Sequence, residues 1–259
     1  MKNAKFALGV YTVYDGLNSD IKDTFLRVKQ MGYQGVEVFR NPVYDALEVR
    51  EALSVSGLEL IGWQTDWALL HKDTIDATIA YSKYVGNPYI IICMLGGEQG
   101  IGHIPAQECE QVWIQHAQEL NRVAQKLRRH GLMLGYHTHE HELLLNYNGQ
   151  TVLDIFCSHL DPDIKLELDT GNAVQAGADP AAYIRKYAQR SHTIHVKPYS
   201  HALGLETMIG DKEDDSDWPA ILNAAKDSAA QWLVVEYYAK RYPPFEAAKL
   251  CLDRLTDGV

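Results

Sequence analysis

Cysteines, basic residues and long apolar runs are scarce in this sequence, and each scarcity excludes a class of protein. The four cysteines among 259 residues form no CxxC pair, which is typical of core residues in a reducing compartment. Acidic residues outnumber basic ones by 34 to 24, so no basic surface for a phosphate backbone is expected. No stretch approaches the roughly 18 apolar residues of a membrane span, and the N-terminal residues do not resemble a signal peptide. We therefore expect a cytoplasmic protein that binds neither nucleic acid nor membrane.

Glycine motifs for nucleotide binding and interdomain linkers are also missing. The chain contains no GxGxxG turn after its first expected strand and no GxxxxGK[ST] loop, so nothing favours the nucleotide crevice of an open parallel sheet. No low-complexity tract or linker rich in proline, glycine and serine divides it. We therefore expect one domain across residues 1–259.

Short apolar runs recur along the chain and alternate with helical patterns. The expected strands cover residues 6–12, 35–39, 58–63, 89–95, 132–138, 164–169, 193–196 and 232–237. The clearest helical pattern covers 106–130, where apolar residues recur every three or four positions and Gly131 follows as a stop. Further helices are expected to begin near residues 21, 45, 73, 151, 179, 218 and 244. Such eightfold alternation predicts a closed (β/α)8 TIM barrel with parallel strands.

Ionisable residues gather at the ends of the last four expected strands. They occur at 136–142, 167–172, 192–197 and Glu236. Because catalytic side chains of a barrel come from the C-terminal ends of its strands, these groups are expected to converge. Strand alternation with a period of two places three pairs on a common face, which should point inward: His137 with His139, Glu167 with Asp169, and His195 with Lys197.

This mixture of carboxylates and imidazoles favours a divalent cation. Neighbouring carboxylates repel one another, whereas a cation turns the same cluster into a favourable site. One divalent ion is expected, with Mn, Zn, Co, Mg and Fe as candidates. Each residue alone has a simpler interpretation: Glu236 as a buried acid paired with Lys197, His137 as a core histidine, and 169–172 as a turn. The coincidence on four consecutive strands favours the metal.

The same segments resemble the xylose isomerase-like barrel superfamily of sugar isomerases, epimerases and related lyases. The matching segments are GYQGVE at 32–37, YHTH at 136–139 with Glu142 after it, LDTGN at 168–172, HVK at 195–197 and DWPAIL at 217–222. In the family these are the second strand, a YHNH signature with a following Glu, the sixth-strand LDTG motif, an HxK seventh strand and a DWxxI segment. The resemblance covers nearly the whole chain and implies the same barrel fold.

The resemblance also implies a ligand set for the metal. Carried over residue by residue, the ligands are Glu142, Asp169, His195 and Glu236. On the fifth strand, His137 and His139 are the alternatives to Glu142. Pro198 stands where the family usually has an Asp after the lysine, so the family's substrate is not carried over.

The expected chemistry is abstraction of a proton next to the carbonyl of a small polyhydroxylated substrate. The metal would stabilise the developing negative charge, with Glu236 or Glu142 as general base and Lys197 as a cationic helper. Candidate substrate-binding residues are Glu37, Trp63, His103, His137 and His139.

The fate of that proton separates the possible functions. Its return to carbon makes the protein a sugar isomerase or epimerase, which is the function we predict. Expulsion of a β-hydroxyl group makes it a lyase of the inosose dehydratase type, which is the alternative. A sugar-binding barrel without turnover is a further alternative, whereas the acidic composition disfavours an endonuclease. The sugar-like substrate is expected to be the main partner, and a homo-oligomer is compatible with the sequence.

Overall fold

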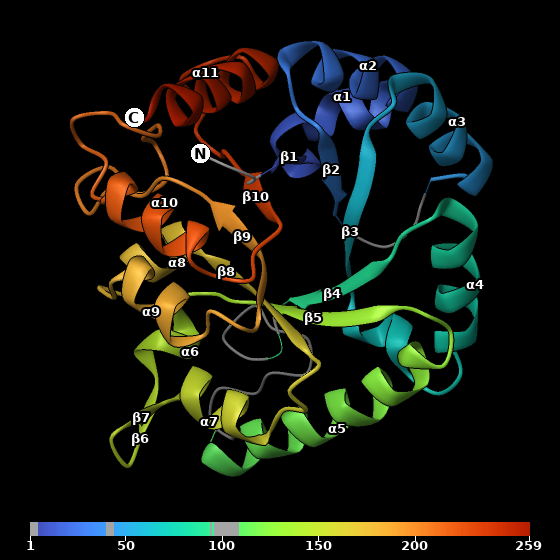
Figure 1. The fold of residues 1–259 in the computed structure, drawn as a ribbon, viewed down its shortest axis with the longest axis vertical. Coiled ribbons are helices and arrows are strands. Elements are labelled where there is room, and N and C mark those ends of the chain that lie inside the picture. Colours follow the sequence, from blue (N-terminus) through green and yellow to red (C-terminus); the bar gives the residue numbers. More distant parts are fainter. Residues whose placement is uncertain (1–4, 40–43, 94, 96–108) are drawn as a thin grey trace.

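A closed barrel of parallel strands, surrounded by helices, forms the centre of the structure, a computed structural model (Figure 1). The structure describes residues 5–39, 44–93, 95 and 109–259. The barrel strands are β1 (Lys5–Gly9), β2 (Gly35–Val38), β3 (Glu59–Thr65), β4 (Tyr89–Cys93), β5 (Met133–His137), β8 (Lys165–Asp169), β9 (Ser191–Val196) and β10 (Trp232–Val235). Strand β1 pairs with both β2 and β10, which closes the ring. The predicted (β/α)8 TIM barrel is confirmed.

Helices follow the barrel strands and cover the outside of the barrel (Figure 1). They are α1 (Tyr14–Ser19), α2 (Ile21–Met31), α3 (Ala46–Ser56), α4 (Ile75–Val85), α5 (Glu110–Arg128), α6 (His141–Leu144), α7 (Val152–His159), α8 (Thr170–Gln175), α9 (Pro180–Lys186), α10 (Trp218–Lys226) and α11 (Pro244–Asp257). Short polar side chains begin several of them. Asp20, for example, accepts a hydrogen bond from the backbone N–H of Asp23 at 2.9 Å, which satisfies a donor that the first helical turn leaves unpaired.

The hydrophobic core lies mainly between the strands and the helices. On α5 the buried residues have the three-or-four spacing seen in the sequence: Trp113, Ala117, Leu120, Ala124 and Leu127. A smaller cluster, the apolar floor, consists of Ala7, Ile61, Trp232 and Val234. Val234 precedes Glu236 by two residues, so the floor closes the barrel interior below the C-terminal strand ends.

Two local features differ from the sequence-based expectation. The first strand, expected over 6–12, ends at Gly9 and is followed by a 3-10 helix (Val10–Val13). A two-stranded hairpin, β6 (Asn146–Tyr147) and β7 (Gln150–Thr151), lies between α6 and α7. In the described part of the chain, no helix has an apolar stretch long enough to cross a membrane.

Candidate metal centre

Polar side chains from several strands meet inside the C-terminal end of the barrel. Asp169 on β8 lies directly opposite His195 on β9, and His195 lies opposite Val234 on β10. Alternation along β10 then carries Glu236, two residues after Val234, to the same side. The pairing of neighbouring strands therefore explains why acids and a histidine from three segments of the sequence converge.

We call Asp169, His195 and Glu236 the upper group. All three are buried, and each offers a ligand atom that lies within 4.8 Å of the others. His195 Nδ1 lies 3.3 Å from Glu236 Oε2 and 3.8 Å from Asp169 Oδ2. Two carboxylates and one imidazole thus face a common point.

Lys197 places an ammonium group beside the two acids of the upper group. Its Nζ lies 3.0 Å from Asp169 Oδ2 and 3.9 Å from Glu236 Oε2, and it donates a hydrogen bond of 2.8 Å to Asn172 Oδ1. Burial alone would lower the pKa of Lys197, but the charges of Asp169 and Glu236 raise it. The lysine is therefore protonated at neutral pH.

Glu236 is held as a carboxylate by its neighbours. Burial acts to raise its pKa, yet the hydrogen bond from His195 and the charge of Lys197 lower it to about 2. Its other oxygen, Oε1, accepts a hydrogen bond of 2.9 Å from Tyr238 Oη. Both carboxylate oxygens of Glu236 are thus fixed in direction.

A second set of polar residues, the lower group, lies deeper in the barrel than the upper group, since Glu167 precedes Asp169 by two residues on β8. Its members are Glu37, Gln64, His137 and Glu167. Glu37 Oε1 lies 2.8 Å from His195 Nε2, and Glu167 Oε2 lies 3.0 Å from His137 Nδ1. Gln64 Nε2 donates to both acids, at 3.0 Å to Glu37 and 3.3 Å to Glu167.

The pKa values of the two acids of the lower group are shifted in opposite directions. Burial, together with the negative charge of Glu167, raises the pKa of Glu37 well above its ordinary value. Burial also acts to raise the pKa of Glu167, but the charge of His195 and the hydrogen bond from His137 lower it well below its ordinary value. Burial opposes a positive charge on His195, yet the charges of Glu167 and Glu37 raise the pKa of that histidine.

The upper group has the chemistry of a divalent-metal site. Imidazole nitrogen and carboxylate oxygen together suit Mn²⁺, Zn²⁺, Co²⁺ and Fe²⁺, and the carboxylates also suit Mg²⁺. Asp169 Oδ2 is buried and accepts no hydrogen bond of good geometry from the described residues, although Lys197 Nζ is close. A buried carboxylate oxygen without such a donor is costly, and a bound cation would remove that cost. The residues present therefore fit a metal ion.

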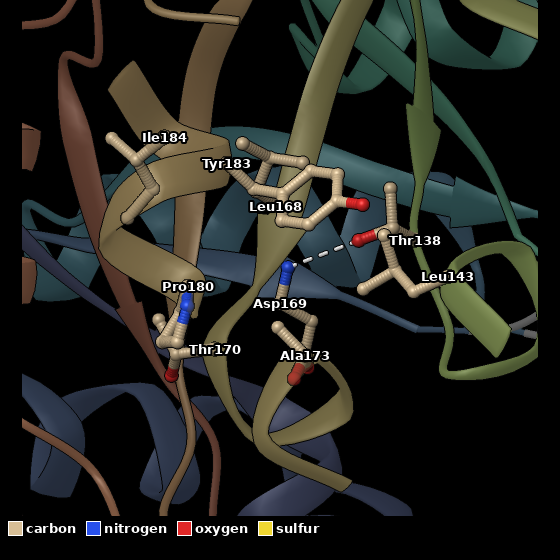
Figure 2. A pocket seen from close by; sticks show the side chains of 9 residues that line it. All are labelled: Thr138, Leu143, Leu168, Asp169, Thr170, Ala173, Pro180, Tyr183 and Ile184. Carbon is tan, nitrogen blue, oxygen red and sulfur yellow. Dashed lines mark hydrogen bonds between the residues drawn. The ribbon is translucent and has the colours of Figure 1, made fainter. Parts of the chain in front are cut away.

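The side chain of Asp169 is positioned by a hydrogen bond at the start of α8 as well as by its place on β8. Its Oδ1 accepts a hydrogen bond of 2.7 Å from the Asn172 backbone N–H and so begins α8, which leaves Oδ2 for the upper group. Its backbone N–H donates to Thr138 Oγ1 at 3.2 Å, as Figure 2 shows. The small pocket drawn there is lined mostly by apolar side chains such as Leu168 and Ile184, so it is a packing gap beside the site.

Glu142, predicted as a metal ligand and possible base, is placed elsewhere. It is fully buried, and its carboxylate accepts hydrogen bonds from Tyr136 Oη and, at 2.6 Å, from the His139 backbone N–H. Among the described residues two sets of side chains could hold a metal ion, the upper group and a set of His137, Glu167 and His195, and Glu142 belongs to neither. The short helix α6 turns Glu142 back toward β5, so we leave it out of the proposed ligand set.

The predicted substrate-binding residues lie in different surroundings. Glu37 and His137 are in the lower group, and the ring of His139 lies 4.9 Å from that of His137. Trp63 is buried with its ring edge-on to Tyr81 of α4, at 5.4 Å, so it belongs to the core between strands and helices. His103 lies outside the described residues.

Two residues of the centre were not found by sequence reasoning. Gln64 is the single amide of its strand, and its alternation with Gly62 was the sequence signal that could have revealed it. Tyr238 follows Glu236 by two residues. It also lines a cavity of about 490 Å³ with Tyr11 and Arg241, beside the upper group.

Residues 25–256 match the sequence profile of the xylose isomerase-like TIM barrel. The chain belongs to this family. An inosose dehydratase from Geobacillus kaustophilus (strain HTA426) is 27% identical over 187 residues, which cover 66% of this chain and 60% of that protein. The match thus spans less than two thirds of that relative's length.

Solved structures of a sugar phosphate isomerase/epimerase and of a sugar epimerase have the same fold. A sugar phosphate isomerase/epimerase from Parabacteroides distasonis ATCC 8503 superimposes with a TM-score of 0.80 at 17% identity, covering 98% of both chains. An L-ribulose 3-epimerase superimposes with a TM-score of 0.76 at 18% identity, covering 98% of this chain and 94% of that one. At these identities the likeness concerns the fold.

Proposed function

We propose that this chain is a metal-dependent enzyme that abstracts a proton next to the carbonyl of a small polyhydroxylated ketone and then expels a hydroxyl group as water. The observation that carries this proposal is the approach of the Lys197 ammonium group to Asp169 and Glu236, the two carboxylates of the upper group. The kinship with an inosose dehydratase supports the same reaction class. Asp169, His195 and Glu236 would hold the ion, with His137 as the candidate fourth ligand from β5.

Glu236 is the proposed general base. A bound divalent ion would polarise the substrate carbonyl and stabilise the negative charge that develops on its oxygen. Glu236 is fixed at Oε1 by Tyr238 and lies 3.9 Å from Lys197 Nζ at Oε2, so its carboxylate is held in one orientation toward the upper group, where it would take the proton. Tyr238, which donates to Glu236, also lines a cavity of about 490 Å³ with aromatic walls, a volume within the size range of small-molecule sites.

Lys197 is the proposed general acid. Asn172 holds its ammonium group, and Gly171 leaves room for its methylene chain, because a Cβ at position 171 would lie 2.9 Å from Lys197 Cε. Glu236 takes the proton from carbon, the bond from the neighbouring carbon to its hydroxyl oxygen breaks, and Lys197 protonates that oxygen, which leaves as water. The two proton transfers balance, and no oxidant or reductant is required.

Epimerisation or isomerisation, the function predicted from the sequence, is the second candidate. It shares the first step and differs in needing a group that returns the proton to carbon. In this reaction His137 of β5, whose Nε2 lies 3.9 Å from Asp169 Oδ2, would return the proton in place of binding the ion. Glu142, the family's acid after β5, accepts hydrogen bonds from Tyr136 and from the His139 backbone N–H, so its carboxylate is not directed at the upper group. We therefore favour water loss over epimerisation or isomerisation.

Incubation with inososes and ketohexoses in D₂O, with Mn²⁺ present, tests the proposal. Water loss yields a product with a conjugated carbonyl that absorbs in the ultraviolet, whereas epimerisation yields a deuterated isomer of unchanged composition. Lys197→Met should retain deuterium uptake while water loss falls by about 100-fold or more, as expected when a general acid is removed. Metal-loaded protein that binds such a ketone but exchanges no deuterium would instead be a sugar-binding barrel.

Four further expectations accompany this proposal and stay predictions. They are a single domain across the chain, a cytoplasmic location, a small sugar-like molecule as main partner and, compatible with the sequence, a homo-oligomeric assembly. The identity of the ion among Mn, Zn, Co, Mg and Fe belongs to the same set, because the ligand types suit several of them.

A further inference from the structure

We propose that Glu37 and Glu167 support the metal site by accepting hydrogen bonds from the imidazole nitrogens of His195 and His137 that face away from the ion. This inference rests on the proposed metal site and is independent of which reaction follows. It makes Glu37 a positioning residue, whereas the sequence suggested that it binds a substrate hydroxyl.

His195 has one ring nitrogen on each side of this arrangement. Its Nε2 lies 2.8 Å from Glu37 Oε1 and 3.3 Å from Glu167 Oε2, while its Nδ1 faces Glu236 and Asp169. A metal ligand must offer a lone pair, so the ring proton has to be on the other nitrogen. A proton on Nε2 meets two carboxylate oxygens and leaves the Nδ1 lone pair for the upper group.

His137 has the same arrangement with its nitrogens exchanged. Its Nδ1 lies 3.0 Å from Glu167 Oε2, and its Nε2 lies 3.9 Å from Asp169 Oδ2. Its ring centre is 4.6 Å from that of His195. The carboxylates of Glu37 and Glu167 therefore contact one nitrogen of each ring, and the other nitrogen of each ring faces the upper group.

The lower group is better suited to support than to holding a second ion. Glu167 Oε1 accepts a hydrogen bond of 2.5 Å from Thr193 Oγ1, and its Oε2 accepts one from Gln64 Nε2. The same amide nitrogen donates to Glu37 Oε1. A cation between these acids would lie against an N–H donor, which repels it.

The lower group is also closed to substrate. Glu37 is 2% exposed and Glu167 is 0% exposed. Glu167 lies two residues deeper on β8 than Asp169, and both acids of the lower group contact ring nitrogens, which orients those rings.

Cobalt binding tests the inference without reference to turnover. The full-length protein, stripped with EDTA, is titrated with Co²⁺ alone and followed by its visible absorption. Loss of an outer carboxylate typically weakens metal binding about 10- to 100-fold, so Glu37→Gln should bind Co²⁺ at least about 10-fold more weakly, with a changed spectrum. Tyr89→Phe is the matched control, because Tyr89 is also buried in the barrel but is not bonded to His195 or His137. The Co²⁺ affinity of this variant should stay within about twofold of the wild-type value.

Nitrogen-15 NMR of the wild-type protein loaded with Zn²⁺ gives a second readout that needs no substitution. The inference predicts a His195 ring with its proton on Nε2, in slow exchange with solvent, and with its Nδ1 signal shifted by the ion. A proton on Nδ1 with Zn²⁺ on Nε2 would overturn the inference, as would equal Co²⁺ affinity and spectrum in Glu37→Gln and wild type. Wild-type protein that binds neither ion would overturn the proposed metal site itself, so the two failures are distinguishable.

Discussion

Metal binding should raise the melting temperature, Tm, of this protein, and the number of residues in the chain sets how large the rise is. The candidate centre buries four acidic side chains, Glu37, Glu167, Asp169 and Glu236, and Asp169 and Glu236 belong to the set that could hold the ion. An ion bound only by the folded state, at 100 times its dissociation constant, adds about 2.7 kcal/mol to the free energy of unfolding. At about 2.1 cal/mol/K per residue, the unfolding entropy of 259 residues is about 0.5 kcal/mol per degree, so Tm should rise by about 5 °C.

Circular dichroism of EDTA-treated protein, heated with and without Mn²⁺, measures this shift. Asp169→Asn should lose most of it, because the substitution removes a ligand's charge while asparagine can still begin α8. Asp215→Asn is the control, since Asp215 pairs with His201 at 2.9 Å on the surface and tests for incidental binding by an acid and a histidine. An unchanged Tm in wild type at millimolar Mn²⁺, or an equal shift in Asp169→Asn, would refute the reasoning.

Three substitutions test the packing around the centre. Gly135→Ala would place a Cβ 1.9 Å from Tyr89 Oη and should lower the free energy of unfolding by about 1–3 kcal/mol or more, measured by urea denaturation; an unchanged midpoint would contradict this. Gly171→Ala would press on both the side chain and the backbone carbonyl of Lys197, so kcat should fall about 10-fold while bound metal, measured by mass spectrometry, is retained. Glu142→Gln should cost about 1–3 kcal/mol of stability and leave the metal content intact, whereas loss of metal would restore Glu142 to the ligand set.

The barrel could be predicted because its strands are separate apolar runs with helical patterns between them. The predicted end of the first strand was wrong, because Val10–Val13 forms a 3-10 helix. Periodicity alone cannot assign a short apolar run to a strand or to a buried helix. The β6–β7 hairpin was missed although its turn, Asn148 and Gly149, is an Asn-Gly pair. Both residues adopt positive φ, at 54° and 86°, as this type of hairpin turn requires.

The centre could be predicted where strand alternation decides which face a side chain takes. The inward direction of three residues followed from the expected strands and the two-residue alternation of side chains alone: Asp169, His195 and Lys197. Trp63 was assigned to the site because the third strand was expected to end there. The strand continues to Thr65, and the alternation places Gln64 inside and Trp63 against α4.

Glu142 shows where local sequence is insufficient. Its place in the motif made it a candidate ligand, but its carboxylate is directed by the helical turn of α6 and by Tyr136, and neither contact can be read from the spacing of residues. The pairing of Glu37 with His195 joins residues 158 positions apart and likewise depends on barrel closure.

Solvent deuterium exchange at the carbon next to a substrate carbonyl, followed by NMR, tests the central claim most directly. Wild-type protein should exchange when loaded with Mn²⁺ or Co²⁺ and lose exchange after EDTA. Metal-saturated Glu236→Gln, with occupancy checked separately, should exchange about 10² to 10⁴ times more slowly, because the general base is gone. Undiminished exchange in chelated wild type would contradict the role of the metal, and undiminished exchange in metal-saturated Glu236→Gln would contradict the role of Glu236.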